Sequence, residues 1–380
     1  MPRTYDVFAG RGTRSVDRTF TEDRGLTDTV SAVLGVGGFV IGTDQPWAYN
    51  SGLAAGDTGA SRVSVNGDLI INTPGTLIEN RDIFGFVKVN AANVTLRNCG
   101  VYGRDAGGSI GYANNGNMID CSANAGGTLV EFCTIRPTIR PTWFWEGIYG
   151  GGYTLRRCDV SGTVDGALVR TGNTIIEGNY FHDFYFSDQS QDQAGSSPPL
   201  WTHNDGVQLR MASQGPVRIV GNNFQWYPDE TFPAPYDRTA VLRTGYGTSY
   251  YRNGLVSPYS GRLLWGSALT ASPDLGPITQ VVCEDNWLEG GTSVFQMSTT
   301  SPAGQPMTFG TLQGNRVGHD QFDFGNGSTY QIRYNTLATV VMTRPNVWDN
   351  VGSVIAWNPA KVGQPLVPGF TGGIRTSAQG

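Results

Sequence analysis

Apolar positions along this chain recur in a template that matches neither a helical period nor simple strand alternation. An apolar residue is followed by two spacers, an Asn or Cys, one spacer and a second apolar residue. Strand alternation would not turn the first apolar position and the Asn or Cys to the same side, so the chain must bend between them. The template occurs in eight rows: Leu96, Cys99, Val101; Val130, Cys133, Ile135; Leu155, Cys158, Val160; Ile176, Asn179, Phe181; Ile219, Asn222, Phe224; Cys283, Asn286, Leu288; Leu312, Asn315, Val317; and Ile332, Asn335, Leu337.

The spacing of these rows predicts that they stack. The shortest separations between successive Asn or Cys positions are 20, 21 and 25 residues, about the length of one coil built from three short strands and three turns. Stacked coils place Asn over Asn, where side-chain amides bond in a ladder, and Cys fills the same slot in three rows as a small apolar substitute. The fold class is therefore all-β, a parallel β-solenoid in which the longer gaps, 179–222 and 222–286, hold long lateral loops.

Three regions follow from where the repeat begins and ends. The run from Asp68 to Cys99 alternates apolar and polar residues with Gly and Pro turns and reads as the first coils. We therefore predict an N-terminal cap or attachment segment over residues 1–64, the β-helix over 65–350, and a Pro- and Gly-rich C-terminal tail over 351–380. An open first coil is an exposed sheet edge, which is why a cap is expected.

Composition narrows the classes of function and of partner. The chain has 53 Gly and 20 Pro among 380 residues and only 15% charged residues, which is typical of a turn-rich, strand-rich protein. A net charge of -5 provides no basic field for nucleic acid or anionic lipid. No segment is apolar enough to insert into a membrane or to serve as a signal peptide, so synthesis in a cytoplasm is expected. The five cysteines match no disulfide framework or zinc site and are interpreted as buried thiols, with no metal expected.

A second column of residues follows each corner and carries candidate chemistry. Four segments fall into register: Glu146-Gly-Ile-Tyr, Asp165-Gly-Ala-Leu-Val-Arg170, Asp205-Gly-Val-Gln-Leu-Arg210 and Arg238-Thr-Ala-Val-Leu-Arg243. This register predicts one file of acids and a parallel file of arginines, with neighbours ~4.8 Å apart. Retaining glycosidases hold two carboxyl groups about 5 to 5.5 Å apart, and inverting enzymes about 6.5 to 9.5 Å. Carboxyl groups this close do not both ionise easily, so one has a raised pKa.

Histidines and tryptophans gather around the same segments. Two of the three histidines, His182 and His203, flank one insertion, and Asp183 follows the first of them. Residues 143–265 hold five of the nine tryptophans, among them Trp201. Aromatic faces beside acids and amides suit a sugar ring, and His near a carboxylate moves protons at neutral pH. We therefore expect Asp165, Asp205 and His203 to be catalytic, and Glu146, Arg170, His182, Asp183, Trp201, Gln208, Arg210 and Arg243 to bind substrate.

Structural roles for the same residues remain open at this point. Asp-Gly at the start of a strand is a common turn, so Asp165 and Asp205 have a second interpretation as corner residues. Simple alternation with Val207 would also point Asp205 into the core, whereas Gln208 and Arg210 have outward parity. The arginines have an alternative role in ion pairs with the insertions, and the histidines as structural hydrogen-bonding groups.

With these motifs in hand, residues 65–350 resemble the pectate-lyase-like superfamily of β-helix proteins. The run TPGTLIENRDIFGFVKVNAANVTLRNC and the later HNDGVQ are similar to segments of bacteriophage tail or tailspike proteins and of secreted actinobacterial carbohydrate-active proteins. The resemblance implies a single-stranded right-handed parallel β-helix in a virion protein that docks on a host surface glycan.

Asn204-Asp205-Gly206 resembles part of the Asn-Thr-Asp-Gly motif of the polygalacturonase family, whose Asp is catalytic, which implies that role for Asp205. The other motifs of that family, and the Arg-x-Pro-x-x-Arg signature of pectate lyases, are absent from this sequence.

The leading hypothesis is therefore a bacteriophage tail protein, tailspike-like or a minor tail protein, that binds a polysaccharide of a bacterial cell envelope and either depolymerises it or only holds it. The alternatives are a secreted glycoside hydrolase or polysaccharide lyase, and a non-catalytic structural or adhesive tail part. Other tail proteins are expected partners, and tailspike relatives suggest a trimer. No organic cofactor is expected, and calcium at the acids is an open alternative.

Overall fold

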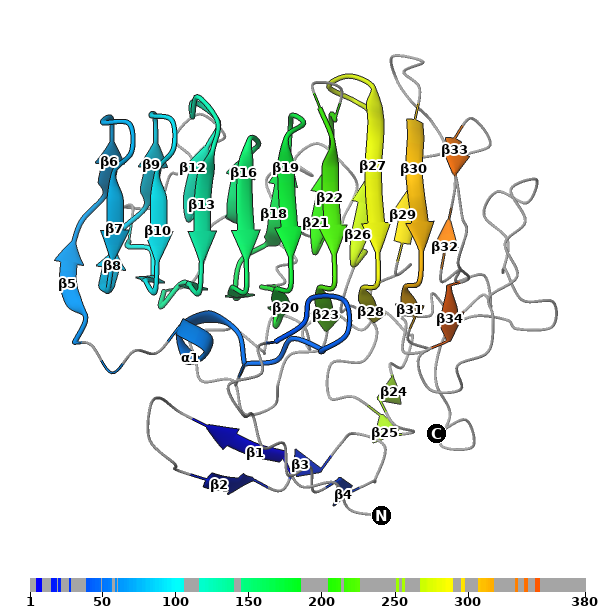
Figure 1. Ribbon diagram of the computed structural model, residues 1–380, viewed down its shortest axis with the longest axis horizontal. Coiled ribbons are helices and arrows are strands. Elements are labelled where there is room, and N and C mark those ends of the chain that lie inside the picture. Colours follow the sequence, from blue (N-terminus) through cyan, green and yellow to red (C-terminus); the bar gives the residue numbers. More distant parts are fainter. Residues whose placement is uncertain are drawn as a thin grey trace.

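In the computed structural model of the chain, almost every regular element is a short strand (Figure 1). The structure describes residues 39–48, 50–56, 59, 61–105, 116–139, 145–185, 204–212, 215–225, 267–289, 295–297, 307–317, 332–333, 338–340 and 346–348, together with the strands β1 (Tyr5–Phe8), β2 (Ser15–Arg18), β3 (Phe20–Thr21), β4 (Thr27–Asp28), β24 (Tyr251–Arg252) and β25 (Leu255–Val256). Within these residues α1 (Gly52–Gly56) is the only helix.

Three stacks of parallel strands form the body, and the chain visits them in turn, as in a parallel β-helix. Sheet I contains β6 (Leu69–Ile71), β9 (Val87–Val89), β12 (Ile119–Cys121), β15 (Glu146–Gly150), β18 (Asp165–Val169), β21 (Val207–Leu209), β26 (Leu269–Ala271), β29 (Phe295–Met297) and β32 (Ile332–Arg333). Sheet II contains β7 (Leu77–Glu79), β10 (Thr95–Arg97), β13 (Thr128–Glu131), β16 (Tyr153–Arg156), β19 (Thr174–Glu177), β22 (Val217–Val220), β27 (Ile278–Glu284), β30 (Met307–Gln313) and β33 (Ala338–Val340).

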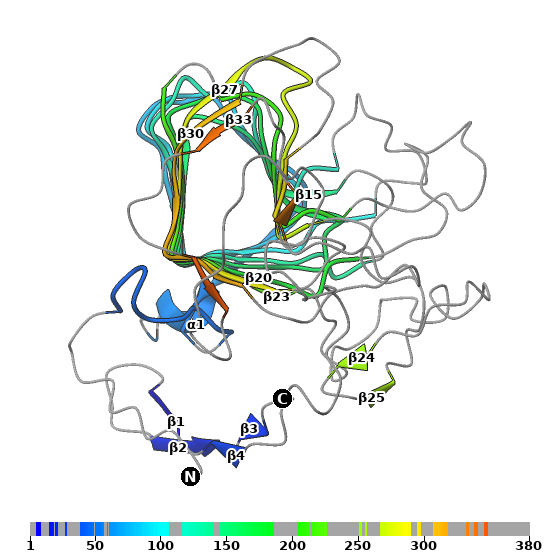
Figure 2. The same cartoon turned by 90° about the vertical axis from the view of Figure 1, so that its right-hand side faces the viewer.

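Sheet III contains β5 (Val63–Asn66), β8 (Arg81–Phe84), β11 (Gly100–Val101), β14 (Thr134–Ile135), β17 (Asp159–Ser161), β20 (Tyr180–His182), β23 (Asn223–Gln225), β28 (Trp287–Glu289), β31 (Arg316–Val317) and β34 (Val347–Trp348). Figure 2 shows the three sheets as three sides around one enclosed core. The all-β, parallel part of the predicted fold class is confirmed.

The corner between sheets II and III carries the predicted Asn and Cys column. In the Asn rows each side chain bonds in both directions along the stack. Asn222 Nδ2 donates to Ile176 O of the preceding coil at 2.9 Å and to Asn286 Oδ1 of the next at 3.0 Å. Its Oδ1 accepts both the backbone N–H and Nδ2 of Asn179, at 3.0 and 2.9 Å. The predicted amide ladder is therefore confirmed, and the same contacts repeat at Asn286 and Asn315.

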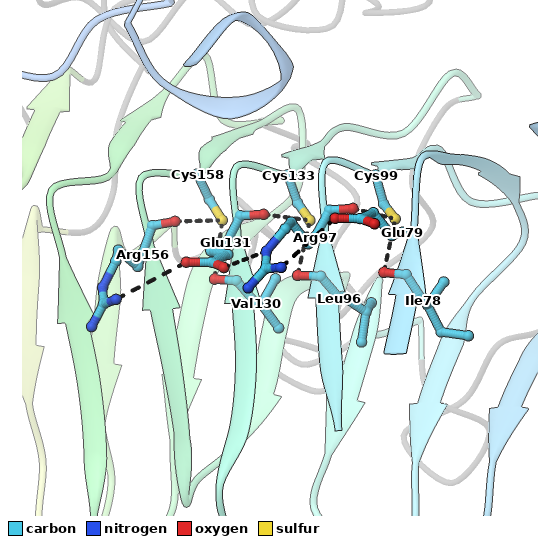
Figure 3. Close-up of polar contacts among 10 residues, drawn as sticks. All are labelled: Ile78, Glu79, Leu96, Arg97, Cys99, Val130, Glu131, Cys133, Arg156 and Cys158. Carbon is cyan, nitrogen blue, oxygen red and sulfur yellow. Dashed lines mark hydrogen bonds and ion pairs between the residues drawn. The ribbon is translucent and has the colours of Figure 1, made fainter. Parts of the chain in front are cut away.

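The cysteine rows reproduce one half of this bonding. Cys133 Sγ donates to Leu96 O at 3.7 Å and Cys158 Sγ to Val130 O at 3.5 Å, the carbonyl positions that receive Nδ2 in the Asn rows (Figure 3). All five cysteines are buried and free, as the sequence predicted. The thiol is thus more than an apolar filler, because it donates to the preceding coil where the amide otherwise would.

A left-handed backbone residue precedes the column position in all seven of the predicted rows that the structure places. The φ angles are Asn98 (51°), Phe132 (54°), Arg157 (53°), Gly178 (64°), Gly221 (63°), Asp285 (56°) and Gly314 (67°), and Asn80 (55°) stands at the same corner one coil earlier, before Arg81. In the seven rows this bend turns the chain from sheet II into sheet III within two residues. Glycine adopts such an angle without steric cost, yet Phe132 and Arg157 adopt it too, so the stacked coils hold the bend in those rows.

The eighth predicted row was wrong. Asn315 Nδ2 donates to Asn346 Oδ1 at 2.9 Å, so Asn346 and not Asn335 continues the column. Ile332 lies in β32, which pairs with β29 in sheet I rather than in sheet II. The template missed Asn346 because the residue three positions earlier is Thr343, which is not apolar.

The outer face of sheet III is covered by another segment of the chain, and the charges on the outer face of sheet II neutralise one another. Residues 39–48 and 50–56, here called the strap, pack on sheet III: Asn223 Nδ2 donates to Pro46 O, and Gly52 N donates to Arg157 O, both at 2.8 Å. On sheet II, charges of alternating sign stack in the order Glu79, Arg97, Glu131, Arg156 and Glu177, of which Figure 3 draws the first four. The Nε to Oε1 distance is 2.6 Å both from Arg97 to Glu131 and from Arg156 to Glu177. These arginines are about 40% exposed, so the pairs align coils more than they stabilise them.

We expect Asn222→Ala to lower the free energy of unfolding by about 3 kcal/mol, because it leaves the Asn179 N–H and the Ile176 carbonyl buried without these partners. Asn222→Cys keeps a donor to Ile176 O and should cost about half as much. Urea denaturation of both variants, beside Asn72→Ala at an exposed Asn, measures the difference. Equal stability of the Ala and Cys variants would show that the thiol does not replace the amide.

Candidate functional site

The candidate site lies at the corner between sheets III and I, because the longest stretches of sequence between strands of the rod fall there. Residues 102–118, 183–206 and 226–268 each join a strand of sheet III to a strand of sheet I. The corner between sheets II and III needs only two residues in each of the ladder rows. The starts of the sheet I strands therefore follow the stretches whose length varies most between coils.

Two stacked glycines, Gly166 and Gly206, set the direction of the acids that precede them. A Cβ atom on Gly206 would lie 2.5 Å from Phe224 Cδ1, and one on Gly166 would lie 2.6 Å from Phe181 Cδ1. These glycines thus occupy the core-facing position, where the rings of Phe181 and Phe224 stack at 4.8 Å between centroids. The acid that precedes each glycine is turned away from the core, so strict alternation with Val207 gave the wrong direction for Asp205.

The predicted acid file exists for its three members. Glu146 and Asp165 are paired positions of β15 and β18, and the pairing of Ala167 with Val207 carries the same register on to Asp205. All three side chains are buried, with 6%, 8% and 3% of their surface exposed. The acids therefore stack as expected but do not present a bare surface to solvent.

The fourth predicted row of this second column was wrong. The strand next to β21 is β26, where Gln208 pairs with Thr270, so Ser267 and not Arg238 follows Asp205 along the stack. Arg243 lies outside the described residues, and so do Trp201 and His203. The 226–268 connection is longer than the sequence register allowed for.

Asp205 bonds to the next coil on the outer side of sheet I. Its Oδ1 accepts the Ser267 N–H at 2.9 Å and the Thr270 hydroxyl at 2.7 Å. Thr270 lies between the core residues Leu269 and Ala271, which fixes its side chain, and with it this carboxyl, on the outer side. Asp165 Oδ1 accepts the Asp205 N–H at 2.6 Å in the same manner. The acids thus join successive coils as the Asn column does at the other corner.

Burial raises the pKa of Asp205 to about 6, and the bonds from Thr270 and Ser267 oppose that rise. A carboxyl group with this pKa is divided between its protonated and ionised forms near neutral pH, which is the property required of a general acid or base. The pKa of Asp205 is raised, as expected for one of the acids, but the cause is burial rather than the repulsion between carboxylates from which the rise was predicted.

His182 is held between two carboxylates. Its Nδ1 lies 2.6 Å from Asp183 Oδ2, and its Nε2 lies 2.9 Å from Asp159 Oδ1. Burial alone would lower the pKa of His182, but the two carboxylates outweigh it and raise the pKa to about 10. The ring is therefore an imidazolium at neutral pH, stacked on Tyr180 at 4.0 Å, and it ties β20 to β17 rather than exchanging protons.

The two described arginines stack as predicted but already have partners. Arg170 and Arg210 donate their backbone N–H groups to Gly150 and Val169 of the preceding strands, so they are neighbours along the rod. Arg170 donates to the Tyr149 hydroxyl and lies 5.4 Å above the Tyr149 ring. Arg210 binds Asp274 through Nε and a second nitrogen, with Nε 2.9 Å from Oδ2. Arg170 therefore lies beside an aromatic ring, whereas Arg210 is paired with a carboxylate.

Sequence reasoning missed four residues that shape this region. Tyr149, Thr270, Asp159 and Asp274 contact Arg170, Asp205, His182 and Arg210 respectively. Only Tyr149 carried a signal, because it stands in the Glu146-Gly-Ile-Tyr segment with outward parity. The other three come from different coils or from a turn, and their positions depend on the stacking.

Within the described residues there is no cluster of three or more His, Cys, Asp or Glu side chains that would hold a metal ion. In the same part of the chain no helix is long and apolar enough to cross a membrane. No family model, no curated protein and no solved structure matches this chain.

We expect the buried Asp205 to make the protein less stable as the pH rises. Its folded pKa of about 6 exceeds the unfolded value of 3.8, so its contribution to stability is complete below about pH 4 and is lost as the pH passes through 6. The loss should be on the order of 2 to 3 kcal/mol. Chemical denaturation between pH 4 and 8 measures it.

Asp205→Asn keeps an acceptor for Ser267 and Thr270 and should remove that pH slope. Asp105→Asn, at an exposed carboxyl, is the control and should keep it. An unchanged slope in the Asp205 variant would show that this carboxyl is ionised at the same pH in the folded and unfolded chains.

Proposed function

We propose that this protein is a β-helical attachment protein that binds a polysaccharide of a bacterial cell envelope along the outer face of sheet I. The observation that carries the proposal is the set of side chains on that face beside the long connections. Tyr149 and Gln208 are half-buried there, and Arg170 lies against the Tyr149 ring. The face therefore combines an aromatic surface, an amide and a cation, which are the groups that sugar rings and hydroxyls contact.

The spacing of coils supports a linear polymer as the ligand. Tyr149, Leu168 and Gln208 are successive outward positions of β15, β18 and β21. Leu168, between the other two, is buried with 3% exposure, so Tyr149 and Gln208, two coils and ~10 Å apart, are the contacts available to a chain laid along the rod. Sheets II and III offer less, because the first carries paired charges and the second is covered by the strap.

Cleavage of the bound glycan is the second candidate function, favoured by the pKa of Asp205. Asp165 and Asp205 stand on adjacent coils, a separation of ~5 Å that suits a retaining glycosidase. A pKa of about 6 lets Asp205 donate a proton near neutral pH. Against this stand the burial of both acids and the use of Oδ1 in each to bind the next coil. Binding is therefore the better supported activity of the two.

We infer that the solenoid is a single-stranded, right-handed β-helix of the pectate-lyase-like kind, since a right-handed crossover is the rule for parallel strands. We place the protein in a bacteriophage tail, as a tailspike-like or minor tail protein with other tail proteins as partners. A secreted glycoside hydrolase or lyase, and a purely structural tail protein, are the alternatives.

The intact protein on an array of envelope polysaccharides tests this proposal. We expect retention on at least one glycan, and Tyr149→Ala and Gln208→Ala should each weaken it about 10-fold, because each removes one contact on sheet I. Thr154→Ala, at a similarly half-buried outer position of sheet II, is the matched control and should bind normally.

The same glycans are then examined for new reducing ends and for unsaturated products. Reducing ends that disappear in Asp205→Asn, with retention unchanged, would establish hydrolysis, and unsaturated products would establish a lyase. Retention on no envelope glycan at all would contradict the proposed function.

A further inference from the structure

Among the residues that the structure describes, the N-terminal end of the rod is an open edge in all three sheets. Sheet I ends at β6, sheet II at β7 and sheet III at β5, and the described residues place no strand beyond them (Figure 1). In β6, Leu69 N donates to Phe86 O and Ile71 O accepts from Asn90 N, so the backbone groups of Ile70 between them point to the open side. Such an edge pairs readily with another strand.

Exposed apolar side chains surround this end. Six large hydrophobic residues are exposed in the described part of the chain, and four of them lie in the first four strands of the rod. They are Val63 on β5 (55%), Ile70 on β6 (59%), Leu77 on β7 (53%) and Phe84 on β8 (38%). Every side of the first coil thus exposes one large apolar side chain, whereas single exposed residues elsewhere need no explanation.

The edge also carries few charges. The three edge strands and the turns between them, residues 63–79, contain two charged side chains. Glu79 in β7 lies 3.7 Å from Arg97, and the second is Asp68. Arg104 binds both of its oxygens, at 2.8 and 2.7 Å, and this hydrogen bonding lowers the pKa of Asp68. Pro74 lies in the turn between β6 and β7, outside both strands. Natural edge strands carry Lys, Pro or inward charges to prevent pairing, whereas the one charged side chain within these three strands is Glu79, which is paired with Arg97.

The strap does not cover this end. It runs along the rod in the opposite direction, with Gly42 beside Asp285 and Gly56 beside Phe132, and both contacts lie beyond the first coils. Its closest described approach to the edge is at Asn98, whose Oδ1 would lie 3.2 Å from a Cβ atom on Gly56, in the coil after the first.

We propose that this open end binds a second copy of the same chain, end to end, across a two-fold axis. Two coils that face each other in this way run in opposite directions, so their edge strands pair antiparallel, and the contact closes without growing into a fibre. The chain carries a net charge of -5, which opposes self-association elsewhere on its surface. An apolar edge whose two charges, Asp68 and Glu79, are each paired with an arginine of the same chain meets its own copy with little of that repulsion.

Sedimentation equilibrium over a range of concentrations tests the proposal independently of any glycan. We expect the wild-type protein to approach twice the chain mass. Ile70→Lys and Leu77→Lys should raise the dissociation constant of the dimer about 100-fold or more, because each places a charge in the joined edge. Leu275→Lys is the matched control, since Leu275 is also an exposed apolar residue but lies in the turn after β26, and it should remain dimeric.

Hydrogen exchange provides a second measurement that a folding defect does not imitate. Amides of residues 63–78 should exchange more slowly as the concentration of wild-type protein rises, while those of residues 174–182 in the middle of the rod should not change. A wild-type protein that is monomeric at every concentration would overturn the proposal and leave the edge to a different protein. An open series of larger species would overturn the two-fold arrangement, and so would dissociation of the Leu275→Lys control.

Discussion

Hydrogen bonds from a buried side chain to the backbone of the neighbouring coil determine how this protein is assembled. At the corner of sheets II and III each Asn donates to the preceding coil and accepts from it, so a shift by one residue would orphan several buried polar groups. The left-handed residue before the column directs the side chain into this position. Because coils have different lengths, this column is what returns every coil to the same register.

Cysteine and asparagine share the column because one property of the side chain matters most. Both donate to the carbonyl three residues before the column in the preceding coil, the thiol weakly and the amide strongly. The amide oxygen also accepts the backbone N–H of the column residue in the preceding coil, as Asn179 Oδ1 does from Cys158 N. Sulfur is a poor acceptor for that hydrogen bond. The first rows of the ladder are therefore bonded less tightly through this column, and there the alternating charges on sheet II add a second alignment of the coils.

The acids at the corner of sheets III and I repeat this design with carboxylates, and this limits their chemistry. Asp165 and Asp205 each use an oxygen to hold the next coil, and burial raises the pKa of Asp205. Stability and proton transfer thus compete for the same groups. The outer face of sheet I avoids this conflict because Tyr149, Gln208 and Arg170 are only half-buried.

The sequence by itself determined the residues of the column and the stacking of the acids, because both are set by local spacing within one coil. It failed at Asn346, where Thr343 breaks the apolar template, and at Arg243, where the length of the 226–268 connection displaced the register. The direction of Asp205 was decided only by tertiary packing, since Gly206 turns toward the ring of Phe224 on β23, in a different sheet. Asp159, which binds His182, and Asp274, which binds Arg210, come from other coils, and the distance along the chain between coils carries no fixed period from which to predict them.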